Sequence, residues 1–279
     1  MSSLRSLLLH LDASPRSAVR LALARDVAAR HDATVTALFG VAPTLLDVSL
    51  ASADGPAGVA LLFEQLSAKR RDDARRLFDR PDFAATPPML WRELSGQPLV
   101  AGVTRHALCS DLLVLGQHDG DDLQALGVPS DFVASVLVAS GKPALVVPYA
   151  GAFATLGRAV LIAWKPTREA ARAVSAALPL LGQAQSIHIT AELDPDAQAG
   201  GTSDLEAYLR LHGVAARIER HAAIPADAAG DMLLSLAAYV GADLLVMGCY
   251  GHSRARELVL GGASRTVLKS MTLPVLMAH

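Results

Sequence analysis

Several features that mark specialised classes of protein are scarce in this sequence. It has two cysteines, Cys109 and Cys249, which provide neither a disulfide framework nor the spacing of a metal site, so a reducing compartment fits. No uninterrupted apolar stretch reaches the roughly 18–20 residues that span a bilayer. The first apolar run breaks at His10 and Asp12, unlike that of a signal peptide. We therefore expect a soluble, cytoplasmic protein with no membrane partner.

An excess of one charge and the common nucleotide motifs are also missing. The net charge is −2 and no long run has one sign, which argues against nucleic acid as the main partner. The pattern G-x-x-x-x-G-K-[ST] does not occur, because Gly141 and Lys142 are followed by Pro143. G-x-G-x-x-G after a strand and G-x-S-x-G are absent too. These absences weigh against a P-loop, a dinucleotide fold of the usual kind and a nucleophile elbow.

What the chain does contain is an internal duplication, in a sequence of 279 residues of which 52% are hydrophobic. Three segments recur: "SDLLVLG" (110–116) as "ADLLVMG" (242–248), "KPALVVP" (142–148) as "LPVLMAH" (273–279), and "LLLHLDASPRSAVRLAL" from Leu7 as "VLIAWKPTREAARAV" from Val160. We therefore predict two domains, a first copy over 1–150 and a second copy over 156–279. The first copy is longer, and we expect its insertion at about 41–88.

Each copy alternates short apolar runs with segments of helical periodicity. This order predicts an α/β fold with two doubly wound, mostly parallel, five-stranded sheets of Rossmann-like type in tandem. Ligands of such sheets bind at the carboxyl ends of strands, where the strand order reverses. The first and fourth strands of each copy are expected to meet there. Residues 12–15 and 116–127 would then lie together in the first copy, and 165–167 and 248–262 in the second.

The second copy has a glycine-rich segment between its fourth strand and last helix. It contains Gly248, Gly251, Gly261 and Gly262. Glycine lets the backbone approach a ligand closely, and amide groups at a helix N-terminus favour an anion. Ser264 could cap the helix or bind an oxygen. Arginines at 254, 256 and 265 add positive charge. These features favour a phosphate ligand.

The spacing Gly248-x2-Gly251-x9-Gly261 resembles the universal stress protein family, whose ATP-binding members have G-x2-G-x9-G-[ST] at this point. The strand order and the last strand with "P-V-L" extend the resemblance to nearly the whole chain. The chain is therefore identified as a tandem member with two domains of the adenine nucleotide alpha hydrolase-like fold. The resemblance implies a stress-response regulatory protein that binds ATP or AMP in the second copy, with Mg²⁺ accompanying ATP. No nucleophile–base pair is evident, so weak ATP hydrolysis is the most that we expect.

The resemblance also implies which residues meet the nucleotide. The aspartate position after the first strand, the backbone after the second strand and the glycine segment would surround it. The expected nucleotide-binding residues are Lys165, Thr167, Ala191, Met247, Gly248, Gly251, His252, Gly261, Gly262, Ala263 and Ser264. Family members often dimerise through their last strands, so the two copies are predicted to form an intrachain pseudo-dimer. Whether two chains form a homodimer is left open.

Two departures from the family pattern lie in the second copy. Gly262 occupies the [ST] position, so a hydroxyl is missing, and Lys165 occupies the aspartate position. The lysine could meet a phosphate or close the adenosine side. Trp164, beside it, could stack on a base or pack the strand end. The alternative function is therefore a stress or scaffold protein that binds no nucleotide and whose pocket is degenerate or adapted to another small ligand.

The first copy departs further. Asp12 is present, but Asp119 replaces the second glycine, and acids at 121, 122 and 131 would repel phosphate. These acids could bind a divalent cation or simply form an acidic surface loop. His10, His188 and His221 lie on predicted strands without ligand spacing, so we interpret them as core or surface histidines and predict no metal site from them.

Overall fold

The computed structural model describes residues 4–42, 55–80, 88–95, 97–122, 127–192, 201–249 and 262–279. These residues form two compact units, which we call the N-terminal unit, Arg5–Ser140, and the C-terminal unit, Gly141–His279 with Leu4. The boundary lies before the segment "ALVV", which ends the first copy of the sequence repeat. No helix among the described residues is long and apolar enough to cross a membrane.

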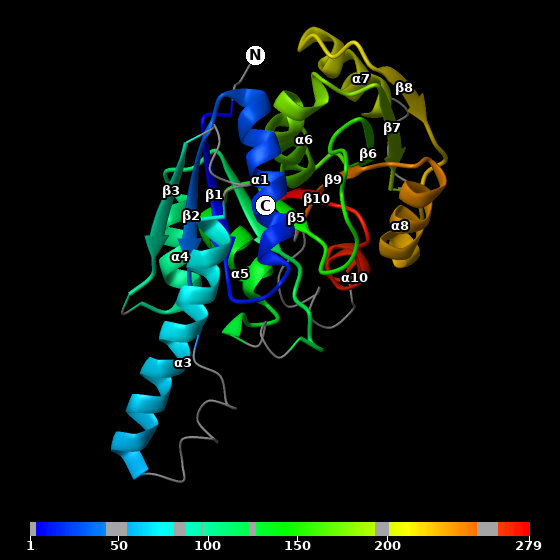
Figure 1. Ribbon diagram of the computed structural model, residues 1–279. Helices are drawn as coiled ribbons and strands as arrows, with labels where there is room; N and C mark the ends of the chain where they lie inside the picture. Colours follow the sequence, from blue (N-terminus) through cyan, green and yellow to red (C-terminus); the bar gives the residue numbers. More distant parts are fainter. Residues whose placement is uncertain are drawn as a thin grey trace. The chain divides into compact units, whose positions relative to one another are not determined.

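The N-terminal unit alternates strands and helices in the predicted order (Figure 1). Its elements are β1 (Ser6–Leu11), α1 (Ser17–His31), β2 (Thr34–Phe39), α3 (Gly55–Phe78), β3 (Met89–Glu93), α4 (Leu99–Ala107), β4 (Leu112–Gly116) and α5 (Phe132–Ser140). The strands are parallel and lie in the order β3-β2-β1-β4. The order reverses at β1, whose neighbours are β2 and β4.

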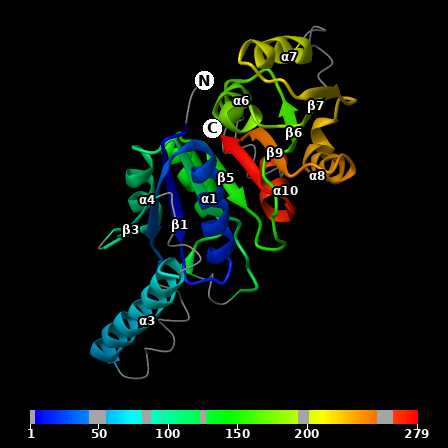
Figure 2. The ribbon, with the colours of Figure 1, turned by 45° about the horizontal axis from the view of Figure 1, so that its top comes forward.

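The C-terminal unit repeats this pattern and contains two additional strands, β5 and β10. Its elements are β5 (Ala144–Val147), β6 (Ala159–Trp164), α6 (Arg168–Leu181), β7 (Ser186–Ala191), α7 (Gly201–Leu211), β8 (Arg217–Arg220), the 3-10 helix η4 (Ala226–Ala228), α8 (Ala229–Tyr239), β9 (Leu244–Gly248), α10 (Ala263–Ser270) and β10 (Val275–Ala278). The strand order is β5-β10-β9-β6-β7-β8. Strands β6 to β10 are parallel to one another, whereas β5 pairs antiparallel with β10. In Figure 2, β10 is the red strand that lies between β5 and β9.

The burial of the strands explains the layers. Strands β1, β4, β9 and β10 are almost wholly buried, as expected for apolar parallel strands that helices cover on both faces. Helix α6 packs on β9 and β10, while α8 packs on α10. The outermost strands, β3 and β8, keep partly exposed side chains. The predicted fold class is confirmed in both units.

The insertion of the first copy lies between its second and third strands. Helix α3 has 24 residues, whereas its counterpart α7 has 11. The insertion therefore lengthens a connection at the side of the sheet and leaves the strand order unchanged. In the C-terminal unit the order reverses at β6, between β7 and β9, so the carboxyl ends of the predicted first and fourth strands are neighbours.

Candidate functional site

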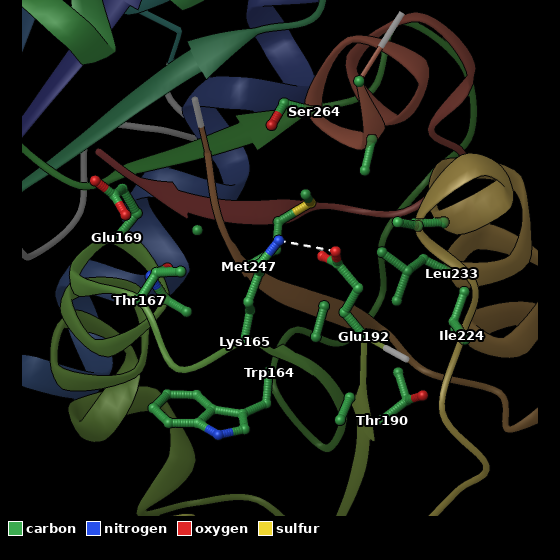
Figure 3. Close-up of a pocket in the computed structure, with 18 of the residues that line it drawn as sticks. Trp164, Lys165, Thr167, Glu169, Thr190, Glu192, Ile224, Leu233, Met247 and Ser264 are labelled. Atoms are coloured by element: carbon green, nitrogen blue, oxygen red, sulfur yellow. Dashed lines mark hydrogen bonds and ion pairs between the residues drawn. The ribbon is translucent and has the colours of Figure 1, made fainter. Parts of the chain in front are cut away.

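A cavity of about 510 Å³ opens at the carboxyl ends of β6, β7 and β9 in the C-terminal unit (Figure 3). This is the position at which the reversal of strand order predicts a ligand. Eight residues of the predicted site line the cavity: Lys165, Thr167, Ala191, Met247, Gly248, Gly262, Ala263 and Ser264. Gly251, His252 and Gly261 lie outside the described residues.

The side chain of Lys165 reaches across this cavity to a carboxylate (Figure 3). Its Nζ lies 2.8 Å from Oε1 of Glu192, with 33% and 29% of the two side chains exposed. Lys165 follows β6 and Glu192 follows β7, and these strands are adjacent, so the pair joins two neighbouring strand ends. The sequence pattern did not identify Glu192. Its position next to Ala191 is the signal that could have found it.

The N-terminus of α6 already has a side-chain cap and a carboxylate of its own. Thr167 is its N-cap, and its Oγ1 accepts a hydrogen bond from the amide of Ala170 at 3.4 Å. Glu169 lies in the first turn, with 5% of its side chain exposed, beside Arg168 at 2.5 Å. Burial alone would raise the pKa of Glu169, but the hydrogen bonds from Arg168 and Thr167 lower it, so this carboxylate is charged. It complements the helix dipole and competes with an external anion.

The N-terminus of α10 differs from that of α6. Its N-cap is Gly262, which makes no side-chain capping hydrogen bond, and its first turn contains no acid. The hydroxyl that the family pattern places here is therefore not replaced at the cap. Ser264, in the first turn, is buried and lines the cavity. Backbone amide groups at such a terminus favour an anion. Compared with the N-terminus of α6, that of α10 is thus the better phosphate site.

Gly248 has a packing role that the loop pattern did not predict. A Cβ added at this position would lie 2.5 Å from the amide nitrogen of Ala170 and 2.7 Å from the carbonyl carbon of Glu169. Contacts of that length do not occur, so the absence of a side chain lets the start of α6 approach the end of β9. Gly248 therefore shapes the cavity wall through backbone packing as well as lining it.

The opposite side of the cavity is largely apolar and is built from β7, α8 and the segment between them. Ile224 and Leu233 are buried there, together with Met247 from β9 (Figure 3). Ala191 is the expected contact for adenine. Its carbonyl oxygen accepts a hydrogen bond from the amide of Ile224 at 2.8 Å, and its second lone pair can accept another. The helix face that presents Leu233 depends on tertiary packing, so the sequence motifs did not identify it.

Trp164 lines the cavity at the end of β6, and its ring lies to one side of the ion pair in Figure 3. Its indole Nε1 is buried and has no hydrogen-bond partner within the described part of the chain. The donor can therefore serve a ligand in addition to any packing role of the ring. A further acid, Asp227 in η4, lines the same cavity. The described lining thus contains three carboxylates, at 169, 192 and 227, and one lysine.

In the first copy, the residue at the aspartate position is engaged by the protein itself. Arg20 Nη2 lies 2.7 Å from Asp12 Oδ1, and their side chains are 4% and 6% exposed. The same oxygen accepts hydrogen bonds from Ser14 Oγ at 2.6 Å and Ser17 Oγ at 2.9 Å. The guanidinium of Arg20 also lies against Gly116, at the end of the fourth strand. Arg20 therefore fills the space between Asp12 and the end of the fourth strand.

Among its described residues, the acidic loop of the first copy has no group of side chains placed to hold a metal ion. Asp119 Oδ1 accepts the amide of Asp121 at 3.1 Å, and Asp131 Oδ2 accepts the hydroxyl of Ser135 at 3.0 Å. Among the described residues, the one cluster of three or more side chains placed to hold a metal is His188, Glu219 and His221 in the C-terminal unit. The pairing of β7 with β8 brings His188 and His221 together, which their sequence spacing did not predict.

Comparison with known proteins agrees with this geometry. Residues 158–279 match the model of the Universal stress protein family. A universal stress protein from Archaeoglobus fulgidus DSM 4304 aligns at 17% identity and a TM-score of 0.69, over 98% of this chain and 95% of its own. A functionally unknown protein from Pseudomonas aeruginosa PAO1 aligns at 15% identity and a TM-score of 0.55, over 98% and 92%. The comparison with curated proteins gives no match.

The solved structures have low sequence identity and therefore establish the fold alone, whereas the family model matches residues 158–279. The model covers the copy that contains the cavity, the glycine segment and both helix N-termini. The second copy, residues 158–279, is therefore a domain of the universal stress protein family.

Proposed function

We propose that this protein is a stress-response regulator that binds ATP or AMP in the cavity of its C-terminal unit. The observation that carries the proposal is the uncapped N-terminus of α10 at a 510 Å³ cavity, at the reversal of strand order. Ligand pockets of roughly 300–1,000 Å³ with an apolar wall and a few polar groups are typical of small-molecule sites. The apolar wall formed by Ile224 and Leu233 suits a base, and the opposite side suits phosphates.

The Lys165–Glu192 pair determines how strongly a phosphate is held. Lys165 would share its charge between a phosphate and Glu192, whose Oε1 lies 2.8 Å from its Nζ. The other lining acids, Glu169 and Asp227, add negative charge that opposes a nucleotide. We expect Mg²⁺ to strengthen ATP binding, because a hard cation shared by carboxylates and phosphates reduces this repulsion. Lys165 thus acts as a ligand group whose strength Glu192 moderates.

Calorimetric titration with ATP and AMP, with and without Mg²⁺, tests the proposal. We expect Glu192→Gln to tighten binding by roughly tenfold, since it releases Lys165, and Lys165→Met to weaken it by roughly 10–100-fold, as for a lost charged hydrogen bond. Lys269→Met, an exposed lysine outside the cavity, is the matched control and should not change affinity. Absence of binding up to roughly millimolar nucleotide would sink the proposal.

A second candidate function follows from the same carboxylates. With three acids and one paired lysine, the described lining suits an uncharged ligand, such as a nucleoside without phosphates, better than a polyanion. The cavity would then serve a member of the family that senses a different small molecule. Adenosine binding more tightly than AMP and ATP in the same titration would favour this function. The opposite order would favour the first.

We further propose a cytoplasmic location, which is supported because neither Cys109 nor Cys249 is part of a disulfide. Association of the two copies as a pseudo-dimer stays a prediction, and so does a homodimer of chains. Light scattering of the purified protein at several concentrations tests the homodimer. ATP hydrolysis, where it occurs, is expected to be weak, because the described lining of the cavity shows no nucleophile–base pair.

A further inference from the structure

Two histidines and one glutamate gather at the side of the C-terminal sheet, on β7 and at the end of β8. We call them the histidine–glutamate cluster: His188, Glu219 and His221. His188 Nδ1 lies 3.0 Å from His221 Nε2 and 3.7 Å from Glu219 Oε2. One ligand atom from each residue lies within 4.8 Å of the others. Three donors from three residues therefore surround one small volume.

The backbone explains why these side chains converge. His188 on β7 is the register partner of Glu219 on β8, so both side chains stand on one face of the sheet. His221 is two residues beyond Glu219 and returns to the same face. Its amide donates to the carbonyl of Ile189 at 2.8 Å, which continues the ladder past the end of β8. The cluster is thus held by paired strands rather than by a loose loop.

The surroundings also orient the carboxylate. Arg217 Nη2 lies 2.6 Å from Glu219 Oε1, which leaves Oε2 directed toward His188. His188 is 7% exposed, whereas Glu219 and His221 are only half-buried, so an ion can enter from the solvent side.

We propose that the histidine–glutamate cluster binds one divalent transition-metal ion, with Zn²⁺ the best match to its donors. Zinc takes imidazole nitrogen and carboxylate oxygen at about 2.0–2.2 Å, and tetrahedral ligands at that radius lie roughly 3.3 Å apart. The present separations need only small side-chain movements to reach this geometry. Mg²⁺ and Ca²⁺ prefer oxygen ligands and fit the two imidazoles poorly. Three protein ligands leave a position for water or another ligand.

A bound ion would fasten the outermost strand of the sheet. β8 has four residues and pairs with β7 alone within its unit. Ligands from β7 and from both β8 and the residue beyond it would join the two strands through the metal. Because an ion bound only by the folded state stabilises that state, Zn²⁺ is expected to raise the melting temperature of the C-terminal unit. The cluster lies outside the nucleotide cavity, so this proposal does not depend on nucleotide binding.

The test uses the full chain, stripped of metal with a chelator that is then removed, without nucleotide. Zn²⁺ is titrated in competition with a chromophoric indicator, and Co²⁺ absorption in the visible range reports the ligand set. We expect one tight site per chain, an increase in melting temperature with Zn²⁺, and at least tenfold weaker binding in Glu219→Gln and in His221→Gln. His212→Gln, an exposed histidine of the same unit, is the matched control and should bind like the wild type.

Circular dichroism of both variants establishes that they remain folded. If His221→Gln does not fold, Glu219→Gln and the Co²⁺ spectrum of the wild type still decide the matter. Absence of a tight site in the wild type, or equal affinity in folded Glu219→Gln and the wild type, would overturn the proposal. His188 and His221 would then be only a hydrogen-bonded pair.

Discussion

The buried pair of Asp12 and Arg20 should be a main electrostatic support of the N-terminal unit, and Arg20→Met tests this. Both side chains are almost fully buried and their closest atoms are 2.7 Å apart. Methionine keeps much of the apolar volume but leaves the carboxylate of Asp12 without a counter-charge. Removing one partner of a buried pair typically costs about 3–5 kcal/mol, because the remaining charge stays desolvated. We expect a loss of that size in the free energy of unfolding of this unit.

The pKa of Asp12 gives an independent magnitude. Burial raises this pKa, but the charge of Arg20, with smaller effects of His10 and Ser14, lowers it from 3.8 to about 2. At about 1.36 kcal/mol per unit, this corresponds to roughly 2–3 kcal/mol of net stability. Since the folded pKa is depressed, the contribution is complete above pH 3.8 and is lost as the pH falls through 2. The difference between wild type and Arg20→Met should therefore narrow in acid.

The assay is urea unfolding followed by the fluorescence of Trp91. The chain has two tryptophans, so a Trp164→Phe background leaves Trp91 on β3 as the reporter of the N-terminal unit. The double variant Asp12→Asn with Arg20→Met removes both charges and should cost less than Arg20→Met plus Asp12→Asn separately, with a coupling of roughly 0.5–3 kcal/mol. A cost below about 1 kcal/mol for Arg20→Met, or additive costs, would refute the reasoning.

Two further predictions concern buried positions. Burial is the main reason that the pKa of His10 is lowered from 6.5 to about 4. The neutral imidazole therefore contributes fully to stability above pH 6.5, and this contribution is lost as the pH falls through 4. The free energy of unfolding of the N-terminal unit, measured with urea, should then fall by about 2–3 kcal/mol between pH 7 and 4.5. His10→Gln should abolish most of this pH dependence. An equal pH dependence in the variant and the wild type would contradict the prediction. Gly248→Ala should lower the stability of the C-terminal unit by about 1–3 kcal/mol through its 2.5 Å clash with Ala170, measured as melting temperature. Gly120→Ala, with no atom nearer than 3.9 Å, is the control, and an unchanged melting temperature in Gly248→Ala would show that α6 moves freely.

The fold was predictable because local signals and the repeat agree with each other. Apolar runs such as 160–164 and 244–248 became β6 and β9, and the residues after them were expected at one cavity. Lys165 and Ser264 do line that cavity. Their positions follow from strand order alone, which alternation of strands and helices specifies.

Other parts of the site could not be predicted because they depend on which side chains meet across elements. Glu192 is one residue beyond an expected contact, but only the pairing of β6 with β7 places it opposite Lys165. The cavity face of α8, with Leu233, depends on the packing of that helix. His188 and Glu219 lie on different strands, so their convergence requires the β7–β8 register and has no sequence spacing.

The two copies have side chains of opposite charge at the same point of the fold, Asp12 in the first and Lys165 in the second. Counted from Asp12 and Lys165, Arg20 of the first copy corresponds to Ala173 of the second, which is fully buried in α6. An arginine paired with the aspartate closes the first site. In the second copy, Ala173 replaces this arginine, so Lys165 at the strand end has no arginine there to repel it. Lys165 instead forms an ion pair with Glu192. Ala173 does not line the cavity, so the exchange of these two residues accounts for the different charge at the strand end and not for the cavity itself.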